Sequence, residues 1–130
     1  MISAIILGAG YGTRLEAELV NLPNDDPFKK QVGKPKPLLP VIFPIENQSR
    51  SLTLLDLWMN ELQNSHCTPK SQDHVRQVFL VVNDLHLGQY KKWAEENQFP
   101  LENIISDGTT TNESRVGAVG CLDLVLKKKG

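Results

Sequence analysis

Three glycines and an arginine stand at alternate positions near the start of the chain: Gly8, Gly10, Gly12 and Arg14. Because a glycine carries no side chain, the backbone N–H groups of such a stretch approach an anion closely, and successive amides form a concave anion-binding nest. A guanidinium adds a planar fork of N–H donors that matches phosphate oxygens. These residue types at this spacing therefore predict a phosphate-binding loop.

Two widespread phosphate-binding motifs do not fit this loop. The P-loop, G-x-x-x-x-G-K-[ST], needs its second glycine at the position of Thr13 when it is counted from Gly8. The dinucleotide-binding fingerprint, G-x-G-x-x-G, also ends on Thr13, or on Leu15 in the next register, and it needs an acid at the end of a second strand. The acids at a suitable distance, Asp25 and Asp26, lie in a proline-containing loop instead.

A third pattern, G-x-G-T-R-L, fits residues 10–15 and is followed at residues 36–40 by the sequence KPLLP. With these two motifs in this order, the chain resembles the sugar-phosphate nucleotidyltransferase family (nucleoside-diphosphate-sugar pyrophosphorylases), whose members carry a G-x-G-T-R-[LM] loop and then K-x-L-[LM]-P. The resemblance covers most of the chain. It implies a reaction in which a sugar 1-phosphate attacks the α-phosphate of a nucleoside triphosphate and pyrophosphate leaves.

The resemblance also implies roles for individual residues. Arg14 would stabilise the departing pyrophosphate, and Lys36, whose two flanking prolines stiffen the backbone, would neutralise the α-phosphate and the incoming sugar phosphate. Mg²⁺ would bridge the phosphates. The base would lie against the first loop and against residues 107–118, where Gly117 leaves room for it. The nucleotide-binding residues expected on this basis are Leu7, Gly8, Ala9, Gly10, Tyr11, Gly12, Thr13 and Gly117.

The sequence departs from the family pattern in two places. The interval between Leu15 and Lys36 is longer than is usual in the family, and its additional piece, residues 20–33, is either a lid or a tolerated surface insertion. The chain ends at Gly130, before the fourth strand whose aspartate binds the catalytic metal in the family and before the region that holds the sugar. The sequence therefore assigns no metal ligand.

Three interpretations remain open: a part or shortened product of a longer enzyme, a nucleotide-binding protein without catalysis, and a regulatory or scaffold subunit. A sheet that ends early exposes an edge strand, which favours pairing with another chain into a homo- or hetero-oligomer. Each motif also has a plainer explanation. The glycine loop is then a tight strand-to-helix turn, Arg14 pairs with Glu16 or Glu18, and Lys36 is a solvated lysine.

The order of apolar segments predicts an α/β fold that would position these residues. Strands are expected at residues 3–7, 77–82 and 103–106, helices at 51–64, 88–97 and 114–129, a long loop at 21–37 and an extended piece at 38–42. This alternation predicts one Rossmann-like domain over residues 1–130, with an open, mainly parallel sheet, helices on both faces, and truncation after the third strand–helix unit. Ligands bind such sheets at the carboxyl ends of the strands, where the glycine loop would lie.

Side-chain patterns give more detail for two of the expected helices. Ser49 or Ser51 is expected to cap the helix at 51–64, because serine is a favoured N-cap residue. In the helix at 114–129, one apolar stripe is formed by Val116, Val119, Leu122 and Leu126.

Composition narrows the class of protein. The chain has 130 residues and a formal net charge of −1, which indicates neither a nucleic-acid-binding nor a membrane-surface protein. Cys67 and Cys121 are far apart, and His66, His74 and His86 have no metal-ligand spacing. The first apolar run is too short for a signal peptide, and no stretch approaches the ~20 apolar residues that span a bilayer. A cytoplasmic location is expected.

Overall fold

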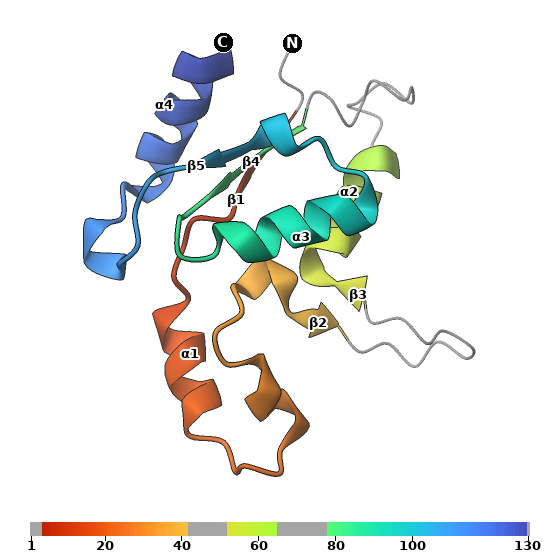
Figure 1. Ribbon diagram of the computed structural model, residues 1–130, viewed down its shortest axis with the longest axis vertical. Helices are drawn as coiled ribbons and strands as arrows, with labels where there is room; N and C mark the ends of the chain where they lie inside the picture. The colour runs from red at the N-terminus through yellow and green to blue at the C-terminus, as the bar shows by residue number, and fades with distance from the viewer. Residues whose placement is uncertain (1–3, 42–51, 65–77, 130) are drawn as a thin grey trace.

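The computed structural model describes residues 4–41, 52–64 and 78–129. Its centre is a sheet of three parallel strands in the order β1-β4-β5, formed by β1 (Ala4–Leu7), β4 (Val78–Val82) and β5 (Ile104–Ser106) (Figure 1). All five residues of β4 are buried, because β4 lies between the other two strands and helices cover both its faces. The predicted α/β fold with a parallel sheet is confirmed.

On one face of the sheet, two helices form a large apolar core. These helices, α2 (Leu54–Asn64) and α3 (Leu87–Asn97), pack against alternate residues of β4, among them Leu80 and Val82. The core also contains the aromatic side chains of Tyr90, Trp93 and Phe99.

The other face of the sheet is covered by α4 (Gly117–Lys129). Its buried residues, Cys121 and Val125, pack against Phe79 and Val81. Because successive side chains of a strand point to opposite faces, β4 contributes its remaining residues to this second, smaller core. Helices on both faces of the sheet were expected, and the structure has them.

The sequence pattern predicts no helix over residues 13–20, but the structure has one there, α1 (Thr13–Val20), immediately after the glycine loop. It extends away from the sheet (Figure 1), and the only residue that it buries is Leu19. Since a helix is found in a sequence by its buried apolar stripe, a helix with one buried side chain gives little signal.

The predicted long loop contains two short 3-10 turns, η1 (Pro27–Gln31) and η2 (Lys36–Leu38). The ammonium group of Lys29 donates hydrogen bonds to the carbonyls of Val20 and Leu22. These carbonyls lie at the carboxyl end of α1, where a cation also interacts favourably with the helix dipole. The loop is therefore folded back onto α1.

The backbone of Gly33 joins this segment to two helices. Its N–H donates to the carboxylate oxygens of Glu16 in α1, at N–O distances of 3.0 and 3.3 Å. Its carbonyl accepts a hydrogen bond from the side-chain amide of Gln89 in α3 at 3.0 Å. The additional piece at residues 20–33 is thus held against α1 through Lys29 and through Gly33 at its end.

A second, two-stranded sheet precedes α2. In it, β2 (Pro40–Val41) pairs antiparallel with β3 (Leu52–Thr53). Of the extended piece expected at residues 38–42, Pro40–Val41 form a short strand, Leu38 belongs to η2, and Ile42 lies outside the described residues. The helix expected at 51–64 begins later, at Leu54, because the preceding two residues are held extended in β3.

The N-terminus of α2 is capped by Thr53. Its hydroxyl accepts a hydrogen bond from the N–H of Asp56 at 3.1 Å, and its own N–H donates to the Asp56 carboxylate at 2.8 Å. This reciprocal pair is a capping box. The caps expected from the sequence, Ser49 and Ser51, lie outside the described residues.

Short 3-10 turns also precede the last strand and the last helix: η4 (Leu101–Asn103) leads into β5, and η5 (Asn112–Ser114) comes before α4. The helix expected from residue 114 therefore begins at Gly117, whose φ of 78° is one that favours glycine. The predicted bound was wrong because the side chain of Thr111 forms a local turn with the N–H of Ser114, which competes with the helix.

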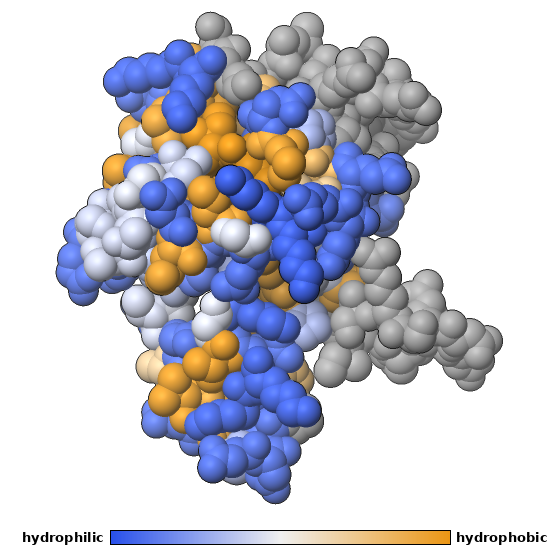
Figure 2. Space-filling view, in the orientation of Figure 1, coloured by the Kyte–Doolittle hydropathy of each residue, from blue (hydrophilic) through white to orange (hydrophobic). Residues whose placement is uncertain are grey.

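The apolar stripe of α4 faces solvent, while the opposite side of the helix packs on the sheet. Its exposed residues are Val119, Leu122 and Leu126, and Val116, just before the helix, is exposed as well. Figure 2 shows apolar surface in the upper left, where Figure 1 places α4. In the described part of the chain, no helix is long and apolar enough to cross a membrane.

Candidate functional site

The glycine loop leaves the carboxyl end of β1 and is fixed there by buried hydrogen bonds. The N–H of Gly8 donates to the carbonyl of Val81 at 2.7 Å, and the hydroxyl of Tyr90 donates to the carbonyl of Gly8 at 3.1 Å. A Cβ atom on Gly8 would lie only 3.0 Å from the Tyr90 hydroxyl oxygen and 3.2 Å from the Val81 carbonyl oxygen. Close packing therefore explains the glycine at this position without a ligand.

A buried asparagine connects this loop to the end of β4. The side-chain amide of Asn83 donates to the carbonyl of Ala9 at 3.0 Å, and its oxygen accepts from the N–H of His86 at 2.8 Å. Asn83 was not among the residues predicted for the site. The signal in the sequence is a polar residue directly after the continuous apolar run of the strand, but its partner is 74 residues away.

The other two glycines of the loop have different environments. Gly12 has a φ of 57°, in the left-handed region, and directly precedes α1, so its backbone conformation favours glycine. Gly10 has no positive φ, and a Cβ built on it would meet no described atom within 4 Å. The fold therefore gives no reason for a glycine at position 10, and the space beside it is open.

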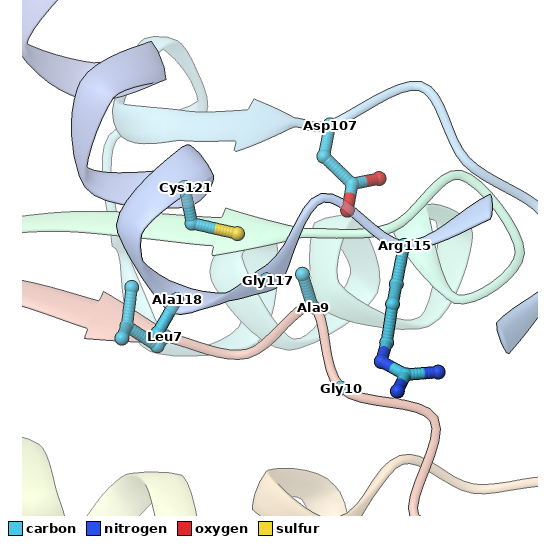
Figure 3. Close-up of a pocket in the computed structure, with 8 residues that line it drawn as sticks. All are labelled: Leu7, Ala9, Gly10, Asp107, Arg115, Gly117, Ala118 and Cys121. Atoms are coloured by element: carbon cyan, nitrogen blue, oxygen red, sulfur yellow. The ribbon is translucent and has the colours of Figure 1, made fainter. Parts of the chain in front are cut away.

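That space is a cavity of about 300 Å³ at the carboxyl ends of the strands (Figure 3). The glycine loop, the end of β5 and the first turn of α4 form it, and its lining residues are Leu7, Ala9, Gly10, Asp107, Arg115, Gly117, Ala118 and Cys121. Its walls are mostly small and apolar, with one carboxylate and one guanidinium. Four of the residues predicted to bind a nucleotide, Leu7, Ala9, Gly10 and Gly117, are brought together here, although Gly117 is far from the others in sequence.

The remaining predicted residues lie elsewhere. Tyr11 and Thr13 line a separate, open groove of about 550 Å³ between α1 and residues 110–113. Arg14, in the first turn of α1, and Lys36, at the start of η2, are exposed and do not line the cavity. Lys36 stands between two buried prolines, Pro35 and Pro37, and is itself exposed.

The carboxylate of Asp107 is held by a chain of hydrogen bonds. One of its oxygens, Oδ1, accepts from the N–H of Thr109 at 2.8 Å and from the Thr109 hydroxyl at 2.7 Å. Because that hydroxyl has a single proton, it is the acceptor in its 2.7 Å contact with the hydroxyl of Tyr11. Tyr11 in the glycine loop therefore helps to orient Asp107. The second oxygen, Oδ2, is buried and has no hydrogen-bond partner.

Burial changes the acid–base properties of two side chains near this site. The pKa of the Cys121 thiol is raised by burial and further by the negative charge of Asp107, so Cys121 stays protonated at neutral pH. The pKa of His86 is lowered by burial, against the opposing effect of Glu16, which favours its neutral form. The charges that face the cavity are therefore those of Asp107 and Arg115.

Arg115 carries the positive charge of the cavity. Its guanidinium donates one hydrogen bond, to the carbonyl of Asn112 at 2.9 Å, and extends toward Gly10 (Figure 3). Within the described residues, Arg115 and Asp107 make no ion pair with each other, because the second oxygen of Asp107 has no partner and the first is occupied by Thr109. Most donors of the guanidinium remain available.

The family resemblance implies a Mg²⁺ ion at the site. Among residues 4–41, 52–64 and 78–129, no group of three or more His, Cys, Asp or Glu side chains is arranged to hold a metal ion. Mg²⁺ in nucleotide sites is commonly bound by one or two carboxylates together with substrate phosphates, and it keeps several waters. Of the described residues, Asp107 is the one carboxylate that lines the cavity.

The cavity is an apolar space with two fixed charges at the switch from strand to helix, the place where parallel sheets bind ligands. Comparison of the sequence with models of protein families and with curated proteins finds no match.

Proposed function

We propose that this chain binds a nucleoside triphosphate and that it forms the triphosphate-binding part of a sugar-phosphate nucleotidyltransferase. The observation that carries this function is the shared cavity. The glycine loop and the segment around Gly117, which the family motifs mark independently, line one apolar space. A tight turn alone would account for Gly8 and Gly12, but it leaves Gly10 and the cavity unexplained.

The dimensions of the cavity suit the nucleoside half of such a ligand. About 300 Å³ is at the lower end of the volumes of small-molecule sites, and Gly10 and Gly117 leave room for a flat ring beside the backbone. The triphosphate would then extend out of the cavity along the backbone amides of the loop. Arg14 follows this loop directly, in the first turn of α1, where the helix dipole also favours an anion.

In this proposal the protein positions phosphates and neutralises charge. An oxygen of the sugar 1-phosphate forms a bond to the α-phosphorus, the bond from that phosphorus to the bridging oxygen breaks, and pyrophosphate leaves with the bonding electrons. The guanidinium of Arg14 binds the departing pyrophosphate, and the ammonium of Lys36 binds the α-phosphate. Mg²⁺, when it is bound, supplies further positive charge to the phosphate oxygens.

Nucleotide binding is tested by thermal unfolding with MgCl₂ and ATP, GTP, CTP or UTP in turn. At saturation, at least one triphosphate should raise the Tm by a few kelvin, since a ligand that binds only the folded state stabilises it. Gly10→Ala should reduce this shift and leave the Tm of the free protein nearly unchanged, because Gly10 lines the cavity and a Cβ there would meet no described atom within 4 Å. Gly88→Ala is a matched control, since Gly88 also has open space around its Cβ position but lies in α3.

The two cations are tested in the same way. Arg14→Ala and Lys36→Ala should each weaken triphosphate binding about tenfold, the scale of one charge-assisted phosphate contact, whereas Lys30→Ala, an exposed lysine of η1, should not. If no triphosphate shifts the Tm of the wild type, or if Gly10→Ala responds like the wild type, the cavity is not a nucleotide site.

Transfer is tested separately from binding. The chain is incubated with MgCl₂, a triphosphate that binds, and glucose 1-phosphate, and released pyrophosphate is measured. Release that requires the sugar phosphate and is lost in Lys36→Ala would assign the reaction to this chain. Binding without release would support the alternative of a nucleotide-binding protein that does not catalyse transfer by itself.

A further inference from the structure

We infer, on the basis of the function proposed above, that residues 13–33 form a lid that closes over the open groove beside α1 when a nucleoside triphosphate binds. Three features carry this inference: the contacts within this segment, its weak attachment to the rest of the fold, and the position of Arg14 in it. Such a lid gives a role to the additional piece at residues 20–33, which the sequence leaves as either a lid or a surface insertion.

Residues 13–33 hold together as one body. The ammonium group of Lys29 donates to the carbonyl of Val20 at the end of α1. The N–H of Gly33 donates to the carboxylate of Glu16, in the middle of α1, at 3.0 Å. In addition, α1 packs against η1. Contacts within the segment therefore connect the helix to the piece that follows it.

Few contacts tie this body to the sheet. None of its described residues belongs to either of the two buried clusters that fill the faces of the sheet. In the parts of the chain that the structure describes, one hydrogen bond joins the body to the helices that cover the sheet. It runs from the side-chain amide of Gln89 to the carbonyl of Gly33 at 3.0 Å. Because this bond is exposed, water replaces it at little cost in free energy.

Two glycines in left-handed backbone conformations stand at the ends of the body. Gly12 precedes α1 with a φ of 57°, and Gly33 ends the segment with a φ of 88°. A Cβ atom on either glycine would meet no described atom within 4 Å. By contrast, Tyr11 is fixed to the rest of the fold by its hydrogen bond to Thr109. Gly12 and Gly33 are therefore the positions at which the body turns.

The groove that such a turn closes lies between α1 and residues 110–113 and has a volume of about 550 Å³. One face of α1 lines it, through residues at helical spacing: Thr13, Glu16, Ala17 and Val20. Two apolar side chains of the groove are largely exposed, Val20 at 50% and Leu85 at 57%. Closure removes apolar surface of this kind from water, which favours the closed state.

Negative charge opposes closure in the free protein. The groove is lined by the carboxylate of Glu16, in α1, and by that of Glu113, in η5, and no cationic side chain is among its described lining residues. Closure brings these two like charges closer together, which costs free energy. The open form of the structure is therefore the one expected without a ligand.

Arg14 connects the lid to the triphosphate. It is exposed in the first turn of α1 and does not line the cavity, although the proposed function places it on the phosphates. Residues 110–113 lie between Asp107 and Arg115 in the chain, and both of these line the cavity. Closure toward residues 110–113 thus brings α1, and with it the long side chain of Arg14, toward the cavity. A phosphate contact made only in the closed state shifts the equilibrium to that state.

The lid is tested in the wild type by NMR, in MgCl₂ with ATP, GTP, CTP or UTP in turn. A nuclear Overhauser effect between the methyl groups of Ala17 and Thr110, on the two walls of the groove, should be weak or absent in the free protein. It should appear with a triphosphate that raises the Tm. This measurement needs no variant, so it does not depend on whether a variant folds.

Disulfide formation in the double variant Ala17→Cys/Thr110→Cys measures the same closure as a rate. With diamide as the oxidant, a triphosphate that raises the Tm should speed this cross-link about tenfold, the scale of the one phosphate contact that Arg14 gains. Peptide mass spectrometry identifies the cross-linked pair. Glu18→Cys/Thr110→Cys is the matched control, because Glu18 is an exposed residue of α1 that does not line the groove, and its rate should not change.

Adding Arg14→Ala to Ala17→Cys/Thr110→Cys tests what drives closure. At a saturating concentration the triphosphate should still raise the Tm of this variant but should no longer speed the cross-link. Acceleration that persists without the guanidinium would overturn the role of Arg14 in closing the lid.

The outcomes separate the two proposals. If no triphosphate raises the Tm, the proposed function fails, and the lid fails with it. If a triphosphate raises the Tm but changes neither the Overhauser effect nor the cross-linking rate, the proposed function stands and the lid is wrong. A triphosphate that slows the cross-link occupies the groove itself, which would also overturn the lid.

Discussion

The two faces of the central sheet are built differently, although they share the same strands. On the face covered by α2 and α3, three aromatic rings fill the space, and the rings of Trp93 and Phe99 lie 5.4 Å apart. On the face covered by α4, Phe79 is the one aromatic residue of the buried cluster, and the inward residues that line the cavity, Ala9 and Cys121, are small. The cavity opens on this second face.

This difference separates a face of the sheet that mainly stabilises the fold from a face that can hold a ligand. Large side chains fill the first face, which we call the closed face. The indole N–H of Trp93 is paired there, because it donates to Asp56 at 2.9 Å. On the second face, small side chains over the carboxyl ends of the strands leave the cavity unfilled, and we call this face the thin face. We expect substitutions on the closed face to affect unfolding most, and substitutions on the thin face to affect ligand binding most.

The largest effect on stability is expected for Leu80→Ala on the closed face. Leu80 is fully buried in the core beneath α2 and α3, so truncation should lower the free energy of unfolding by about 3 kcal/mol. Urea denaturation followed by circular dichroism measures this change. A loss below about 1 kcal/mol would mean that the closed face collapses around the missing atoms and is not tightly packed.

The next effect distinguishes two glycines of one loop. Gly8→Ala should lower the free energy of unfolding by about 2 kcal/mol, since its Cβ would press on the Tyr90 hydroxyl and on a backbone carbonyl. Gly10→Ala should change it by less than about 0.5 kcal/mol, because the added methyl group meets open space. Equal losses in the two urea titrations would contradict the difference between the packed and the open end of the loop.

A matched pair of valines compares the faces directly. Val82 and Val81 are adjacent in β4 and equally buried, but Val82 points to the closed face and Val81 to the thin one. Val82→Ala should lower the free energy of unfolding by about 2 kcal/mol and Val81→Ala by about 1 kcal/mol, because α4, which packs beside a cavity, can move to fill the gap. A larger loss of unfolding free energy for Val81→Ala than for Val82→Ala would contradict the proposed difference between the two faces.

The smallest effect concerns the pH dependence of Cys121 on the thin face. Its pKa is raised above the ordinary value, first by burial and then by Asp107, so its thiolate forms only at higher pH than that of an exposed cysteine. Since the unfolded chain ionises first, this residue should make stability fall as the pH rises above the ordinary thiol pKa. Below that pKa both states are protonated and its contribution is constant.

Alkylation of Cys121 with iodoacetamide, located by peptide mass spectrometry, follows this titration. Asp107→Asn should move the onset of reaction to lower pH, because it removes the negative charge that opposes the thiolate. Identical pH profiles for the wild type and Asp107→Asn would show that burial alone raises the pKa of Cys121.

Much of the fold follows from local patterns in the sequence. The three strands of the central sheet are marked by continuous or nearly continuous apolar runs, and they begin and end within one residue of the expected bounds. The helix α1 could not be found in this way, since most of its side chains are exposed. The start of α4 was also missed, because a side-chain turn at Thr111 replaces the first helical turn.

The candidate site was predictable only in part. The glycine loop and the segment around Gly117 could be singled out by motif, and they line the same cavity. The contacts that give this cavity its polarity join distant residues, as in the hydrogen bonds from Asn83 to Ala9 and from Tyr11 to Thr109, and no local pattern encodes them. The roles of Arg14 and Lys36 remain predictions.

The attachment of α1 has a consequence for the order in which parts of the molecule open. This helix buries only Leu19 and is joined to α3 through the peptide groups of Gly33, so few buried contacts oppose its separation from the sheet. Amide hydrogens of α1 should therefore exchange with solvent by local unfolding, long before those of β4. Since Arg14 lies in α1, an anion bound there would be visible as slower exchange in this helix, while the exchange of the central strand stays the same.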